Sequence, residues 1–426
     1  MKIAVLTMFN GLSNTYSLVN VVEEQLKMLL CHGLEIKVLV SEHCPDSERR
    51  GVFCDERLEW IKVINSKGGE MFHWRTYTGA KDKIHDSFFE EAESIAADFV
   101  KHLQDVDVCI MHDILYQGVH LVHNVAVRKA QKQLPNVRFL AFTHSAPANH
   151  IEAPYPINCM FTPMANTTYI YPTECGLKGL ASQYSVEESR CAAVNNSIDP
   201  LLGMGQETRK IIHGSQTLQK DIVIVYPARL TMSKRFHIVA ELGGFIKTLC
   251  KKSVEIIFCD FPCADIDPHM YKFMVKSIGI KSGLAQEDII FTSDVGFKDG
   301  VKRETVFELF TLGNLFICPS YSESFGLTVI EAASRGNYLV LNEAVPPLEE
   351  LGNKLGAYFM RWGAKNFGFD TQERYLPSEE EYYIENVKKI VANMEENPVI
   401  RGKTLARQEY SNVRVYEAQL KPLLFK

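Results

Sequence analysis

The sequence lacks several features that would identify a class of protein directly. It has no run of about 18 consecutive apolar residues, so we expect no transmembrane helix. None of its eleven cysteines forms a Cys-x-x-Cys pair, which argues against a zinc ribbon or a thioredoxin-like site. With a net charge of −6 and a pI near 6.1, it has no general basic field for nucleic acid. We therefore expect a globular protein without a nucleic-acid partner.

The cysteines indicate a cellular compartment. Cys109, Cys259 and Cys318 lie inside apolar runs and are predicted to be small buried side chains. An odd number of cysteines without a framework spacing is typical of a reducing environment, so we expect a cytoplasmic protein. The first residues, MKIAVLTMFNG, carry one lysine and a short apolar run, which predicts a buried strand rather than a signal peptide.

The first half of the chain alternates short apolar runs with amphipathic segments. The runs KIAVLT and EIKVLV flank SLVNVVEEQLKMLL, whose apolar spacing predicts a helix ended by Gly33. Later runs are VDVCIM, VRFLAFT, TTYIYPT and CAAVNNSID. Continuous apolar strands joined by helical crossovers predict a doubly wound parallel sheet in an α/β protein.

The rhythm breaks at residues 200–220, which are polar, contain three glycines and are predicted to form a linker. A second series of strands and helices follows, with the apolar runs DIVIVYPAR, VEIIFCD, DIIFTS, NLFICPS and YLVLNE. We therefore predict two Rossmann-like lobes, residues 1–200 and residues 201–404. A last helix, at about 405–426, is predicted to pack back on the first lobe.

The stretch SESFGLTVIEAASRG follows the run NLFICPS, so it belongs at the carboxyl end of a strand, where ligands bind in such sheets. A helix starting near Gly326 presents free N–H groups that favour an anion. Glu323 and Glu331 flank this start, and carboxylates accept hydrogen bonds from paired sugar hydroxyls. The alternative is a helix with an ordinary acid before its first turn and one solvated glutamate.

The stretch YPARLTMSKRF lies at the end of the first strand of the second lobe. Arg229 and Lys234 are two cations at a strand-to-helix junction, which suits a diphosphate. Ser233 is expected to cap the next helix. The alternative is a pair of ordinary surface cations. Both stretches fall at carboxyl ends of strands in one predicted sheet, which favours a shared site.

Together these residues resemble the retaining glycosyltransferases of the GT-B fold. The large family concerned, glycosyltransferase family four, includes sucrose synthase, glycogen synthase relatives and phosphatidylinositol mannosyltransferases. The E-x7-E element of that family is matched by Glu323 to Glu331, and its arginine–lysine pair by Arg229 and Lys234. In the first lobe, TTYIYPTECGLKGLASQY and NNSID resemble other family elements more diffusely. The resemblance implies two lobes that face each other across a cleft.

The resemblance also implies roles in the second lobe. Arg229 and Lys234 would hold the donor diphosphate, Glu323 would contact the donor sugar, and Glu331 would bind the ribose. The backbone around the helix start would contact the sugar and the distal phosphate, and the stretch FTSDVG would lie against the base. The other residues that the resemblance implies for donor binding are Ser324, Phe325, Gly326, Leu327, Thr328, Asp294 and Val295.

In the first lobe, His144 matches a family histidine that lies near the donor sugar, with His150 as a second candidate. A histidine after a strand is also commonly just a satisfied polar residue. Asn10 and Gly11 would approach the acceptor or the phosphates. The chain departs from the family pattern here, because the family often has two glycines in this loop and a glycine where this chain has Ser197.

The function implied is transfer of a hexose from a nucleotide sugar to a hydroxyl acceptor, which is a saccharide, a protein or a lipid-linked molecule. A UDP-sugar is the first expectation and GDP-mannose the second. The family needs no obligatory metal, and no cofactor or metal is expected. Three alternatives remain: a sugar phosphorylase or nucleotide-sugar hydrolase on the same fold, a silent nucleotide-sugar-binding protein, and an NAD dehydrogenase. The loop MFNGLSN lacks the GxGxxG pattern and counts against the last.

A small basic cluster indicates at most weak peripheral contact with a membrane. It consists of Arg128, Lys129, Lys132 and Arg138. A basic helical face of this kind can touch anionic lipid, although such a cluster is more often a solvated helix end.

Overall fold

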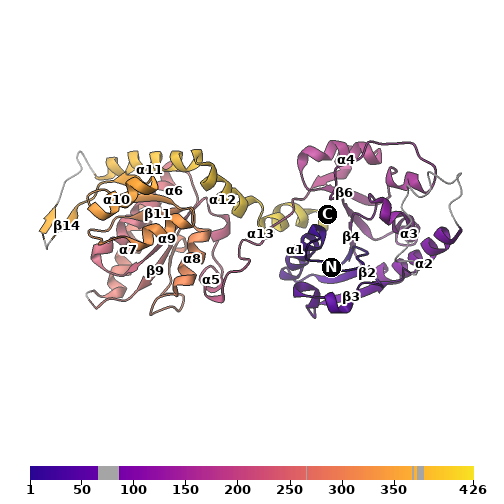
Figure 1. Ribbon diagram of the computed structural model, residues 1–426, viewed down its shortest axis with the longest axis horizontal. Helices are drawn as coiled ribbons and strands as arrows, with labels where there is room; N and C mark the ends of the chain where they lie inside the picture. Colours follow the sequence, from indigo (N-terminus) through magenta and orange to yellow (C-terminus); the bar gives the residue numbers. More distant parts are fainter. Residues whose placement is uncertain (66–85, 265, 367–368, 372–378) are drawn as a thin grey trace. The chain divides into compact units, whose positions relative to one another are not determined.

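The computed structural model describes residues 1–65, 86–264, 266–366, 369–371 and 379–426 (Figure 1). The chain forms two compact units. Met1–Ile198 and Asn412–Lys426 make the first, and Asp199–Ser411 make the second. Both ends of the chain therefore lie in the first unit.

The first unit is built on a parallel sheet with the strand order β3-β2-β1-β4-β5-β6-β7. The order reverses between β1 and β4, which is the switch point of a doubly wound sheet. The strands are β1 (Lys2–Leu6), β2 (Glu35–Ser41), β3 (Leu58–Val63), β4 (Val108–His112), β5 (Arg138–Phe142), β6 (Thr167–Tyr171) and β7 (Cys191–Ala193).

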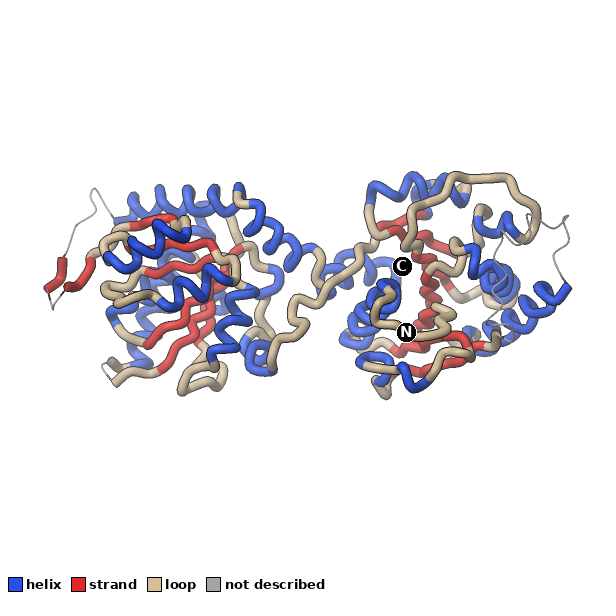
Figure 2. Tube along the Cα trace, viewed as in Figure 1, coloured by secondary structure: helices blue, strands red, loops and turns tan. Residues whose placement is uncertain are grey.

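Helices cover both faces of this sheet because successive strand side chains point to opposite sides. Ile3 and Val5 of β1 pack with α1 (Ser17–Cys31) and with the C-terminal segment that contains α13 (Asn412–Val415) and α14 (Lys421–Leu424). Ala4 and Leu6 pack on the other face. The helices on that face are α2 (Asp86–Leu103), α3 (Leu121–Gln131) and α4 (Leu177–Tyr184). Figure 2 shows these helices around the strands.

The second unit repeats the arrangement with the order β10-β9-β8-β11-β12-β13, again all parallel. The predicted α/β class with two doubly wound, Rossmann-like lobes is confirmed. The strands are β8 (Ile222–Arg229), β9 (Val254–Phe261), β10 (Ile289–Phe291), β11 (Leu315–Cys318), β12 (Tyr338–Asn342) and β13 (Tyr358–Met360), and β14 (Ala364–Asn366) pairs separately with β15 (Phe369–Thr371). The helices are α6 (Phe236–Cys250), α7 (Pro268–Ser282), α8 (Arg303–Leu312), α9 (Leu327–Ser334), α10 (Pro346–Leu355), α11 (Glu379–Glu396) and α12 (Pro398–Glu409).

The prediction of a plain linker at residues 200–220 is wrong. This stretch contains α5 (Gln206–Ile211), and Ile211 is buried in the core of the second unit. The carboxylate of Glu308 on α8 accepts hydrogen bonds from the N–H of Gly205, at 3.0 and 3.1 Å, and from the hydroxyl of Thr208. The segment is polar because it lies on the surface, yet these contacts fix it to α8.

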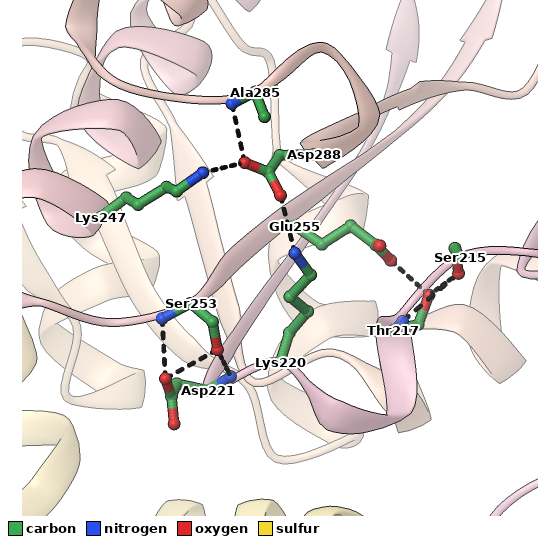
Figure 3. A network of polar contacts seen from close by, with 9 residues as sticks. All are labelled: Ser215, Thr217, Lys220, Asp221, Lys247, Ser253, Glu255, Ala285 and Asp288. Atoms are coloured by element: carbon green, nitrogen blue, oxygen red, sulfur yellow. Dashed lines mark hydrogen bonds and ion pairs between the residues drawn. The ribbon is translucent and has the colours of Figure 1, made fainter.

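The amino edge of the second sheet is held by a polar network (Figure 3). Asp288, which is 1% exposed, accepts from Lys220 at 2.7 Å and from Lys247 at 2.5 Å. Burial opposes ionisation of Asp288, but the hydrogen bonds from both lysines outweigh it and hold its pKa below the usual range. Thr217 likewise donates to the buried Glu255. Because these charges satisfy one another, we interpret this edge as structural.

Cys109, Cys259 and Cys318 are buried, as predicted, whereas other cysteines are exposed, among them Cys31 and Cys54. All eleven cysteines lie within the described residues and are free thiols, and burial raises the pKa of Cys318 to about 11.

Arg128 donates to the carbonyl oxygens of Cys159, Thr162 and Pro163. Arg138 donates to those of Leu423 and Leu424, and Lys129 pairs with Glu93. The described part of the chain contains no helix with the length and apolarity to cross a membrane.

Candidate active site

Two loops meet at the carboxyl edge of the second sheet, beside its switch point between β8 and β11. The N–H of Tyr321, after β11, donates to the carbonyl oxygen of Ser233, after β8, at 3.0 Å. The guanidinium of Arg235 lies 3.5 Å from the centroid of the Tyr321 ring and donates to the Pro319 carbonyl at 3.2 Å. Arg235 is buried and has a left-handed backbone, with φ of 50°. Nothing in the local sequence distinguishes Arg235 from its neighbours as the residue that joins the loops.

The joined loops bring Lys234 and Glu323 together in an ion pair. Their side chains are 22% and 18% exposed, so both remain open to a ligand. The hydroxyl of the buried Tyr226 donates to the Lys234 carbonyl oxygen at 2.7 Å and fixes the backbone there. Arg229 ends β8, is exposed and forms no ion pair with the residues that the structure describes. Among these residues, Lys234 is thus a paired cation and Arg229 an exposed one.

The amino end of α9 adjoins this pair. Gly326 precedes the helix with a left-handed φ of 90°, as the predicted helix start requires. A Cβ there would lie 3.1 Å from Leu348 and 3.2 Å from Val329, so the close packing also selects glycine. Within the described ranges, no group accepts a hydrogen bond from the amides of Phe325, Gly326 and Leu327. These amides form an electropositive turn, with Ser324 exposed before it and Thr328 half-buried inside the helix.

The prediction that Ser233 caps the next helix is wrong. Helix α6 has no side-chain cap, and the Ser233 hydroxyl instead contacts Thr231 Oγ1 at 2.9 Å. The reason is the short 3-10 turn Met232–Lys234, which places Ser233 outside the N-cap position.

Glu331 lies one turn inside α9 and is largely buried, with a side chain 9% exposed. Its Oε1 accepts a hydrogen bond from Nε of Arg303 on α8 at 2.9 Å, and Nη2 of the same guanidinium lies 2.8 Å from it in an ion pair. Arg303 itself lies over the Phe307 ring. The pairing orients the carboxylate that was expected to bind ribose.

The predicted base-binding loop follows β10. Asp294 accepts from Lys272 at 2.5 Å and from Lys276 at 2.8 Å. Burial opposes its ionisation, but the two lysines outweigh burial and lower the pKa of Asp294. Val295 packs partly against the core, and the buried Asp260 holds the loop by accepting from the Ser293 N–H at 3.0 Å. The Asp294 carboxylate is thus already engaged, and the backbone N–H groups of Asp294 and Val295 close the turn by donating to the carbonyl oxygens of Phe291 and Thr292.

In the first unit, His144 lies just beyond the carboxyl end of β5, next to the switch point. Its Nε2 is 2.9 Å from Nδ1 of His112, the last residue of β4. Its backbone N–H donates to the carboxylate of Asp113 at 2.9 Å. Burial lowers the pKa of His144, although the nearby Asp113 opposes this, and burial raises the pKa of Asp113. His150, the second candidate, is exposed and contacts the Gln183 carbonyl at 3.1 Å.

Asn10 and Gly11 lie in the loop after β1, and Asn10 is exposed. The carboxylate of Glu48 accepts from the Leu12 N–H at 2.6 Å, and a Cβ on Gly11 would lie 3.0 Å from Glu48 Oε2. The guanidinium of Arg50 also donates to the Leu12 carbonyl oxygen, so the loop lies between a carboxylate and a cation. The expectation that Asn10 and Gly11 approach the acceptor or the phosphates stays a prediction. Glu48 follows β2, and its distance in the sequence hid the contact.

The described residues contain no group of three or more His, Cys, Asp or Glu side chains placed to hold a metal ion.

Comparisons with known proteins give weak similarities. No family model matches the chain, and no curated protein matches its sequence. Among solved structures, an α,α-trehalose-phosphate synthase (UDP-forming) from Burkholderia xenovorans shares 14% identity over 100% of both chains, with a TM-score of 0.39. A glycosyltransferase from Rickettsia africae shares 14% identity over 100% of this chain and 99% of its own, with a TM-score of 0.37. A sucrose-phosphate synthase from Thermosynechococcus elongatus shares 12% over 100% and 99%, with a TM-score of 0.36.

Proposed function

We propose that the protein is a retaining glycosyltransferase that moves a hexose from a nucleotide sugar to a hydroxyl acceptor. The observation that carries this proposal is the grouping of the Lys234–Glu323 ion pair with the free amides of Phe325–Leu327 at one edge of a doubly wound sheet. Cations and amides suit a diphosphate, and a carboxylate suits sugar hydroxyls. A UDP-sugar is the preferred donor and GDP-mannose the next.

In this proposal the donor diphosphate takes over Lys234 from Glu323. Lys234 and the free Arg229 neutralise the charge that develops as the nucleoside diphosphate leaves. Glu323 is thereby released to accept hydrogen bonds from the donor sugar. The acceptor hydroxyl attacks on the face that the diphosphate leaves, and a phosphate oxygen takes its proton, so retention needs no second carboxylate. For His144 and the loop of Asn10 and Gly11 we propose contacts with the sugar and the acceptor.

The test begins with a screen of nucleotide sugars for thermal stabilisation, because a true donor raises the melting temperature by mass action. Release of the nucleoside diphosphate is then measured with the donor that binds. Lys234→Ala and Glu323→Gln should each lower turnover by about 100-fold or more while the fold persists. The matched controls are Lys354→Ala and Glu350→Gln, which remove the partners of an exposed ion pair on α10 and should not change turnover.

The outcome also separates the rival functions. Sugar release that depends on free phosphate would indicate a phosphorylase, and release in water without any acceptor effect would indicate a hydrolase. Tight donor binding without release would indicate a silent binding protein. Near wild-type release by either Lys234→Ala or Glu323→Gln would overturn the assigned roles.

A further inference from the structure

Three side chains of the first unit, two of them buried and the third partly buried, form a continuous hydrogen-bonded chain. Gln25 on α1 places its Oε1 2.9 Å from Nε2 of His112 on β4. Nδ1 of His112 lies 2.9 Å from Nε2 of His144, and the two ring planes differ by 17°. Gln25 is 3% exposed and His112 is 0% exposed. The chain thus runs from the interior of the lobe to the loop after β5.

The chain has a direction, because an amide oxygen can only accept a hydrogen bond. His112 must therefore carry a proton on Nε2. Burial and the neighbouring His144 hold the pKa of His112 well below its ordinary value, so the ring is neutral and carries that proton alone. Its Nδ1 is then an acceptor, and Nε2 of His144 must be the donor.

The direction determines the free end of the chain. A neutral His144 with its proton on Nε2 has a lone pair on Nδ1. That atom is buried and has no partner among the residues that the structure describes. A buried acceptor without a partner is costly, and a ligand that donates a hydrogen bond would satisfy it.

We propose that Gln25, acting through His112, fixes the tautomer of His144 so that Nδ1 accepts a hydrogen bond from a hydroxyl group of a bound sugar. Gln25 and His112 are positioning residues, and neither touches the sugar. The identity of the ligand rests on the proposed function, whereas the direction of the chain does not. The Asp113 carboxylate accepts from the backbone of His144, so it orients the residue without reversing the chain.

The tautomers can be read directly by long-range ¹H–¹⁵N correlation spectra of the full chain at pH 7.5, assigned with His112→Gln and His144→Gln. We expect both histidines to be neutral, with the proton on Nε2. A proton on Nδ1 of His144 in the wild type would overturn the proposal without any variant.

Gln25→Met removes the acceptor at nearly constant size. Without this acceptor, neither tautomer of neutral His112 is favoured. Both tautomers of His144 should therefore become populated. Gln25→Glu keeps an acceptor and should preserve the wild-type pattern. Gln183→Met is the matched control, because Gln183 is an equally buried glutamine that bonds to Ala148 and Met160 and should leave the tautomers unchanged.

The second readout separates this inference from the proposed function. Gln25→Met should lower kcat/KM for the nucleotide sugar by about twofold if the two tautomers of His144 become equally populated, because only the competent fraction binds the sugar productively, and should not alter affinity for the nucleoside diphosphate alone. An unchanged tautomer in Gln25→Met would refute the relay. The expected tautomers in a chain that transfers no sugar would support the relay and refute the function.

Discussion

Lys234 and Glu323 lie 89 positions apart in the chain and form an ion pair at the carboxyl edge of the second sheet. Each therefore competes with a ligand for the other. This competition predicts opposite effects of two substitutions on binding of a nucleoside diphosphate that carries no sugar. Lys234→Ala removes a cation and should weaken binding by about tenfold or more.

Glu323→Gln frees Lys234 and removes a negative charge, so it should strengthen the same binding by a few fold while transfer is lost. Isothermal titration with UDP and with GDP at fixed ionic strength measures both effects, with Lys354→Ala as the control for a lost lysine. If Glu323→Gln weakens binding as much as Lys234→Ala does, the competition is absent.

Arg235 predicts a separate effect on stability. Its guanidinium joins the two loops through Tyr321 and Pro319, while its left-handed backbone, with φ of 50°, is unfavourable for a side chain. Both Arg235→Ala and Arg235→Gly should lower the free energy of unfolding of the second unit. The glycine variant should be more stable than the alanine variant by about 1 kcal/mol, because glycine adopts this backbone without strain.

Urea denaturation of both variants, followed by hydrogen exchange of β8 and β11, measures the difference. Equal stabilities would show that the backbone conformation at Arg235 carries no strain. A variant as stable as the wild type would show that the guanidinium does not hold the loops.

The orientation of the Glu331 carboxylate leads to a prediction about binding of the ribose of the nucleotide. Because Arg303 holds only its Oε1, the carboxylate is oriented and retains capacity to accept from hydroxyls. The wild type should bind UDP about tenfold more tightly than 2′-deoxy-UDP or 3′-deoxy-UDP, and Glu331→Ala should lose this preference. Arg303→Ala should reduce the preference partly, since it removes only the orientation. A preference that survives in Glu331→Ala would place the ribose elsewhere.

Local sequence patterns predicted those strands and helix starts whose own residues show their structural environment. The run IVIVY of β8 is apolar throughout because both faces of that strand are covered. Such a run can be recognised as a buried strand without knowledge of the rest of the chain. The start of α9 could also be predicted from its own residues, because Gly326 occupies a backbone conformation that favours glycine. Helix α5 was missed because its surface residues are polar, although the adjacent Ile211 and Ile212 mark a buried side.

The hydrogen-bond and ion-pair partners of the candidate site residues could not be predicted from the sequence. Arg303 and Glu331 are 28 positions apart, Leu12 and Glu48 are 36 apart, and Gln25 and His112 are 87 apart. Each pair is brought together by the packing of separate elements, and nothing in the local sequence of either residue specifies the other. Sequence patterns therefore predicted where the loops with the candidate residues lie along the chain, and only the structure identifies which groups orient those residues.

The buried histidines of the first unit predict that stability falls in acid. His123 on α3 is 1% exposed, its Nδ1 lies 3.0 Å from Nδ1 of His120, and its Nε2 has no partner within the described part of the chain. Burial, with His120 nearby, holds the pKa of His123 well below its ordinary value. In the unfolded chain the pKa returns to about 6.5. Below that pH the unfolded state binds a proton that the folded state does not bind. The free energy of unfolding therefore decreases as pH falls.

His123→Leu removes this group, fills the same space and eliminates the unpaired nitrogen. The variant should therefore lose less stability than the wild type between pH 6.5 and pH 5, by up to about 1.4 kcal/mol for each pH unit, which is the contribution of one proton. Urea denaturation at each pH, followed by hydrogen exchange of α3, measures the slope. His43→Gln, at an exposed histidine of the same unit, is the control for the loss of one histidine. An unchanged slope in His123→Leu would show that His123 takes up a proton in the folded state as readily as in the unfolded chain.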